Sequence, residues 1–142
     1  MTALIYAEND IRHQRGVELV CLLYSGAITR VSRALERLEI NQSQERGAAI
    51  GGAMAIIVEL QGALDGDAGG QIAKDLAKLY DYIQDRLITG HAERNGEPLV
   101  EARNLLQTLL GGWQDCRAAL EEPVPEPERL AVGGNSRRSW TL

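Results

Sequence analysis

The side chains that most often do chemistry in proteins are sparse in this chain of 142 residues, which has two histidines and two cysteines. His13 follows Asp10 by three positions and His91 precedes Glu93 by two. A zinc deaminase would also need a Pro-Cys-x-x-Cys motif, and a di-iron bundle would need Glu-x-x-His on two helices. Because neither motif is complete, we expect both histidines to be solvated residues near helix ends and no metal to be bound.

Other catalytic and cofactor motifs are also incomplete. The glycine-rich run from Gly47 to Met54 follows no predicted strand and lacks the Gly-Lys-Ser/Thr that grips a nucleotide, so it is typical of small residues on a close-packed helix. Cys21 and Cys116 each replace an apolar residue in a helical stripe, which favours buried thiols. No nucleophile has an identifiable base and orienting group. We therefore predict no catalytic residue, no cofactor and no small-molecule substrate.

Composition narrows the class of protein further. Hydrophobic residues make up 44% of the chain and charged residues 25%, with a formal net charge of −5. This length fits one domain that buries its own core. The acidic balance argues against binding to nucleic acid or to an anionic membrane, and no apolar run is long enough to span a bilayer. A basic leader sequence is also missing at Met1, so we expect a cytoplasmic protein.

Apolar residues recur every three or four positions in four stretches, which predicts four amphipathic helices. The predicted helices cover residues 17–38, 50–64, 72–87 and 98–120, with a glycine-rich link over 65–70. Helices of similar length with short links bury their apolar faces by packing antiparallel. The predicted fold is all-α, an antiparallel up-and-down four-helix bundle that forms a single domain over residues 1–121.

Both ends of the chain depart from this pattern. The short apolar stretch Ala3–Tyr6 is expected to pack on the bundle. Prolines at 123, 125 and 127 cannot continue a helix, so residues 122–142 are expected to form a mobile tail rich in proline and glycine. Trp140 in this tail is either an adventitious aromatic or a docking element.

Two features exceed what a bundle core requires. Leu19 and Leu22 fall on the far side of the first predicted helix, so its first turns are apolar all round. Tyr80 and Tyr82 flank the third stripe at opposite edges, where a ring can bury its body and keep its hydroxyl wet. Such positions serve either edge packing or an apolar groove for a partner helix.

The chain resembles the FliS family of flagellin export chaperones in three stretches and in its last helix. Leu22–Ile28 reads Leu-Leu-Tyr-Ser-Gly-Ala-Ile, similar to the Met-Leu-Tyr-Asp-Gly-Ala-Ile that opens the family's first long helix. The remaining matches are Ala55–Leu60 leading to Leu64-Asp65 and Gly69-Gly70, then Leu76–Ile83 with its Leu-Tyr-Asp-Tyr string, then Arg86-Leu87, and finally Leu106, Leu109 and Trp113. Together these stretches cover about residues 19–113 in the family's order.

The resemblance implies a cytoplasmic helical bundle that binds the disordered C-terminal segment of flagellin, prevents premature polymerisation and delivers flagellin to the flagellar type III export apparatus. The candidate flagellin-binding residues are Leu19, Leu22, Leu23, Tyr24, Tyr80, Tyr82 and Ile83. A tyrosine in the family's N-terminal segment is linked to docking on the export gate, and here it corresponds to Tyr6, which follows Ile5.

Two other hypotheses stay open. The extra apolar face could be a dimer interface of a self-associating structural or regulatory bundle, which would sediment as a dimer. An enzyme with an unrecognised site would show turnover or tight metal retention.

Overall fold

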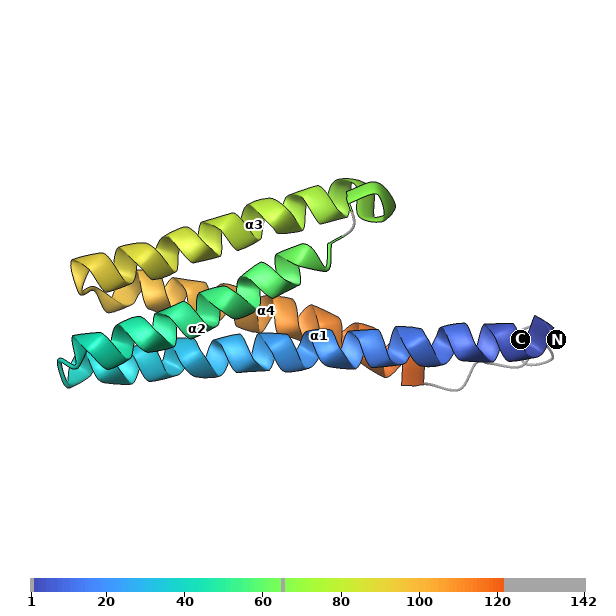
Figure 1. The fold of residues 1–142 in the computed structure, drawn as a ribbon, viewed down its shortest axis with the longest axis horizontal. Helices are drawn as coiled ribbons and strands as arrows, with labels where there is room; N and C mark the ends of the chain where they lie inside the picture. Colours follow the sequence, from blue (N-terminus) through green and yellow to red (C-terminus); the bar gives the residue numbers. More distant parts are fainter. Residues whose placement is uncertain (1, 65, 122–142) are drawn as a thin grey trace, which may run out of the picture.

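The computed structural model describes the backbone of residues 2–64 and 66–121 and the side chains of residues 15–64 and 70–120. Four helices account for nearly all of this part of the chain: α1 (Thr2–Glu39), α2 (Ser43–Gly62), α3 (Gly66–Glu93) and α4 (Gly96–Glu121). Consecutive helices run in opposite directions (Figure 1). The predicted all-α four-helix bundle is therefore confirmed.

The four helices form a ring in which each packs against two neighbours. Within the described chain, α1 contacts α2 and α4, and α3 contacts α4 and α2. The diagonal partners α1 and α3 meet only through side chains that reach the middle of the bundle, where Tyr24 and Tyr80 lie. Apolar side chains from all four helices form one continuous core.

The links between helices are short because polar residues adopt the left-handed backbone conformation that ends a helix. Asn41 has a φ of 59°, and the N–H of Gln42 donates to the carbonyl of Arg37 at 2.8 Å. Arg94 has a φ of 53°, and the next residue, Asn95, accepts a hydrogen bond from the N–H of Glu97 at 3.1 Å. The side chain of Asn95 thereby caps the start of α4.

Helix boundaries differ from the predicted ones at the amino-terminal ends. Residues 2–16 continue α1 in place of a separate short segment, and Figure 1 shows these first turns extending beyond the other three helices. The second helix begins seven residues earlier than predicted, at Ser43. The third begins at Gly66, within the predicted link, and is kinked at Gly70, whose φ of 57° is left-handed. The fourth has Pro98 in its first turn, as predicted.

The expectations for residues 122–142, including the role of Trp140, lie outside the described residues.

Candidate partner-binding surface

Three of the predicted flagellin-binding residues lie in the core. Tyr24, Tyr80 and Ile83 are at most 1% exposed. The hydroxyls of the two tyrosines hydrogen-bond to each other, and their ring centroids lie 6.4 Å apart. A partner cannot reach these side chains while the bundle is closed, so the structure places them among the residues that hold α1 and α3 together.

Burial changes the acid–base behaviour of this tyrosine pair. Loss of hydration raises the pKa of Tyr24, and hydrogen bonds from Tyr80 and Trp113 only partly offset it. Loss of hydration is also the main cause that raises the pKa of Tyr80 well above its ordinary value, and its hydrogen bond to Tyr24 adds to the rise. Both hydroxyls are therefore neutral at physiological pH and act as structural groups.

Two of the remaining predicted residues form an accessible apolar patch on α1. Leu19 is 58% exposed and Leu22 is 69% exposed, and we call this pair the apolar patch. The neighbouring Leu23 is half-buried and packs against the core. Close to the patch, α1 and α2 approach each other at Gly26, where an added Cβ would lie 3.3 Å from the side chain of Ile56. The apolar patch thus sits on a rigid helix pair.

Tyr82 lies elsewhere, at the junction of α3 and α4. Its ring is 43% exposed, and its hydroxyl donates to a carboxylate oxygen of Glu101 at 2.5 Å. That hydrogen bond is the main cause that raises the pKa of Tyr82. Arg86 lies over the ring at 5.8 Å and within 3.7 Å of the same carboxylate. Tyr82, Arg86 and Glu101 therefore form one polar cluster across the two helices.

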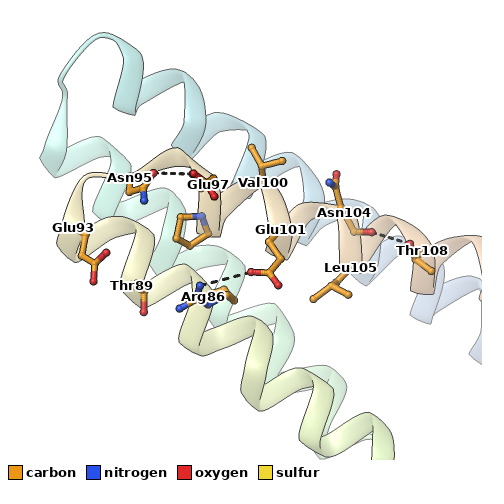
Figure 2. A pocket seen from close by; sticks show the side chains of 11 residues that line it. Arg86, Thr89, Glu93, Asn95, Glu97, Val100, Glu101, Asn104, Leu105 and Thr108 are labelled. Atoms are coloured by element: carbon orange, nitrogen blue, oxygen red, sulfur yellow. Dashed lines mark hydrogen bonds and ion pairs between the residues drawn. The ribbon is translucent and has the colours of Figure 1, made fainter.

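Arg86 and Glu101 of this cluster line a groove between α3 and α4 of about 910 Å³ (Figure 2). Its lining combines the carboxylates of Glu93, Glu97 and Glu101 with apolar surface from Pro98 and Leu105. Sequence reasoning missed this groove because it depends on the divergence of two helices after their tight link. The one signal available was the spacing of the three glutamates at intervals of four residues.

The residues predicted to dock on the export gate lie in the first turns of α1. Ile5 and Tyr6 belong to the helix that begins at Thr2, but their side chains lie outside the described ones. Their role stays a prediction.

Of the two histidines, only His91 has a described side chain, and His13 lies outside the described side chains. Nδ1 of His91 accepts a hydrogen bond from Nε of Arg46 at 3.0 Å, and Arg46 is only 2% exposed. Cys21 is buried as predicted, Cys116 is exposed, and both are free thiols. Among the side chains of residues 15–64 and 70–120, no three His, Cys, Asp or Glu groups are arranged to hold a metal ion. None of the described helices is long and apolar enough to cross a bilayer.

In a comparison with known proteins, residues 2–120 of the chain match the family model described as "Flagellar protein FliS". The chain is 36% identical to the flagellar secretion chaperone FliSB of Pseudomonas aeruginosa over 95 residues, which are 67% of this chain and 75% of that protein. It is 29% identical to the flagellar secretion chaperone FliS of Salmonella typhimurium over 123 residues, which are 84% of this chain and 91% of that protein. The chain belongs to the FliS family, which is a family of chaperones and not of enzymes.

Proposed function

We propose that this protein is a flagellar export chaperone that binds the C-terminal segment of flagellin in the cytoplasm. It keeps that segment from polymerising and delivers flagellin to the gate of the flagellar type III export apparatus. Membership of the FliS family and the names of its relatives support the chaperone role.

The apolar patch is the observation that carries the client-binding part of the proposal. Leu22 is among the most exposed large apolar side chains in the described chain, and Leu19 is one helical turn away from it. Large apolar side chains held on a rigid helix lose contact with water when a partner covers them, which favours binding. We therefore place the main apolar contact of the client segment on the apolar patch.

Tyr82 and the groove between α3 and α4 offer a second accessible contact. Because α1 and α3 occupy diagonal positions in the described bundle, one client segment that touches both Leu22 and Tyr82 must cross the bundle surface. A flexible segment can do so, and its ordering on binding offsets part of the interaction energy. This cost keeps the affinity moderate enough for release at the export gate.

Self-association as a structural or regulatory bundle is the second candidate function, and the exposed leucines of the apolar patch favour it. A two-fold interface built on the apolar patch would hide the same leucines in a homodimer. In that case sedimentation would show a dimer that Leu22→Ala converts to a monomer.

Calorimetric titration with a C-terminal flagellin peptide from the same organism tests the proposal. We expect a 1:1 complex with a negative heat-capacity change, because apolar surface is buried as the peptide becomes ordered. Leu22→Ala should weaken binding by about tenfold, the equivalent of about 1.4 kcal/mol, which lies near the low end of a leucine's burial energy.

Ile72→Ala is the matched control, since Ile72 is a 72% exposed aliphatic side chain on α3. It should leave the affinity within about twofold of the wild type. Failure of the wild-type protein to bind the peptide while folded and monomeric would refute the client assignment, and a stable dimer would favour the alternative.

A further inference from the structure

Three arginines form a row on α1 beyond the apolar patch. Arg30, Arg33 and Arg37 are spaced three and four residues apart, so they lie on the same face of the helix. Together with Glu45, Ala48 and Ala49 of α2 they line a depression of about 260 Å³. We call these three side chains the arginine row.

Two glycines make room for the first member of the row. An added Cβ at Gly52 would lie 2.7 Å from Nε of Arg30, and one at Gly26 would lie 3.7 Å from its Nη1. That Nη1 also donates to the carbonyl of Gly26 at 3.5 Å. The side chain of Arg30 therefore lies against α2 beside Gly52, in space that a larger residue at that position would fill.

No described carboxylate forms an ion pair with the arginine row, and Glu45 is the one carboxylate that lines the depression. Arg37 donates instead to the neutral amide oxygen of Gln42 at 3.3 Å. Three neighbouring arginines and one carboxylate leave a local excess of positive charge in a chain whose net charge is −5.

The arginine row and the apolar patch share one side of α1. Leu22 and Arg33 are eleven residues apart, which is about three helical turns. Leu19 and Arg37 are eighteen residues apart, which is about five turns. Residues separated by whole turns lie on the same side of a helix. At about 1.5 Å per residue, Leu22 and Arg33 lie about 16 Å apart along the helix axis. A single segment of about 20 residues can therefore lie on both surfaces.

We infer that the arginine row binds an acidic stretch of a partner peptide, while the apolar part of the same peptide covers Leu19 and Leu22. Guanidinium groups bind carboxylates through paired, charge-assisted hydrogen bonds, and their spacing along α1 suits carboxylates one helical turn apart. Only the apolar half of this inference rests on the proposed chaperone function.

A peptide is favoured over a nucleic acid because the positive charge is local. Phosphate backbones bind to extended basic surfaces, whereas this row spans two helical turns in an acidic protein. A short acidic segment contacts the row without laying further negative charge along the rest of the surface.

Fluorescence anisotropy with a labelled helical probe peptide tests the inference. The probe has two leucines on one face and, three turns further along that face, three glutamates spaced three and four residues apart. A second probe carries glutamine in place of each glutamate. We expect the glutamate probe to bind at least tenfold more tightly than the glutamine probe at low salt, and to lose this advantage as salt is raised.

Two double variants of the protein distinguish binding of the probe at the arginine row from general electrostatic attraction to the protein. Arg30→Gln/Arg33→Gln removes two exposed charges from the row, and Lys74→Gln/Lys78→Gln removes two exposed charges from α3. The arginine variant should weaken glutamate-probe binding at least tenfold, and the lysine control should stay within twofold. Equal losses in both variants, equal binding of both probes, or no binding of the glutamate probe would overturn the inference.

Two further results distinguish this inference from the proposed function and from other ligands. If the flagellin peptide fails to bind while the glutamate probe still depends on the arginine row, the proposed client is wrong and the inference stands. Tighter binding of a single-stranded DNA with the same dependence on Arg30 and Arg33 would assign the row to nucleic acid and overturn it.

Discussion

At the scale of single residues, Tyr24 and Tyr80 show how the bundle uses groups that look functional in the sequence. Their hydroxyls meet in the core, where each satisfies part of the other's hydrogen-bonding capacity. An unpaired hydroxyl at this depth would be destabilising by about 1–3 kcal/mol. The pair therefore joins the diagonal helices α1 and α3 with a polar contact that only the folded state can make.

This tyrosine pair predicts a loss of stability at alkaline pH. An unfolded tyrosine ionises near pH 10, whereas the pKa values of Tyr24 and Tyr80 are raised in the folded protein. Above about pH 10 the unfolded chain releases protons that the folded chain keeps, so the free energy of unfolding should fall as the pH rises. Each tyrosine can contribute a slope of up to about 1.4 kcal/mol per pH unit in that range.

Urea unfolding at a series of pH values measures this slope. The Tyr24→Phe/Tyr80→Phe double variant should lose less stability than the wild type between about pH 10 and pH 11, because phenylalanine has no proton to release. Tyr82→Phe is the comparison at an exposed site: the hydrogen bond to Glu101 also raises the pKa of Tyr82, so the double variant should reduce the slope more than Tyr82→Phe does. Equal slopes for the wild type and the double variant would show that the buried pair does not govern the alkaline transition.

At the scale of elements, close packing at the end of α3 depends on the absence of a side chain at Gly90. An added Cβ would lie 2.6 Å from Cδ2 of Leu99 and 3.0 Å from the carbonyl oxygen of Asn95. We expect Gly90→Ala to lower the free energy of unfolding by about 1–3 kcal/mol, because the core leucine and the α3–α4 link must both shift. Chemical denaturation measures this change.

Gly111 provides the matched helix control for Gly90. It lies inside α4, and an added Cβ there would meet nothing within 4 Å. Gly111→Ala should raise the free energy of unfolding by up to about 1 kcal/mol, because alanine is the better helix former. If Gly90→Ala stabilised the protein to a similar degree, the α3–α4 link would be able to move away from the added Cβ, and the prediction for Gly90 would be wrong.

The existence of all four helices could be predicted from their apolar stripes, but some boundaries could not. The start of α2 was missed because Arg46, a charged residue, occupies the core position one turn before Ile50, where the predicted apolar stripe began. Two of its three guanidinium nitrogens have partners on another helix, because Nε donates to the ring and Nη2 to the carbonyl of His91, whereas Nη1 has no hydrogen-bond partner among the described residues. Such a partner 45 residues away cannot be identified from local periodicity.

The candidate site was predicted only in part, for a similar reason. The wheel position of Leu22 indicated an exposed leucine, and the structure places it there. The same kind of reasoning could not separate Tyr80 from Tyr82, because burial depends on which neighbouring helix covers each edge of α3. The arginine row and the groove between α3 and α4 likewise require the pairing of helices.

At the scale of the whole molecule, α1 links two proposed contacts. It extends past the other helices at its N-terminal end (Figure 1). Ile5 and Tyr6 belong to these first turns, and the apolar patch lies further along the helix. Tyr6 and Leu19 are thirteen residues apart, which is about 20 Å of helix. That separation leaves room for the proposed flagellin contact and the proposed export-gate contact to form at the same time.

The last prediction is that these two contacts can be uncoupled by mutation. Tyr6→Ala should leave the affinity for the flagellin peptide within about twofold of the wild type, because substitutions about 20 Å apart usually have independent effects. It should weaken binding to the purified export-gate protein and lower flagellin secretion. Leu22→Ala should do the reverse, with weaker peptide binding and unchanged gate binding. If Tyr6→Ala instead weakened peptide binding as strongly as Leu22→Ala, the first turns of α1 would belong to the client site, and separate client and gate surfaces would be ruled out.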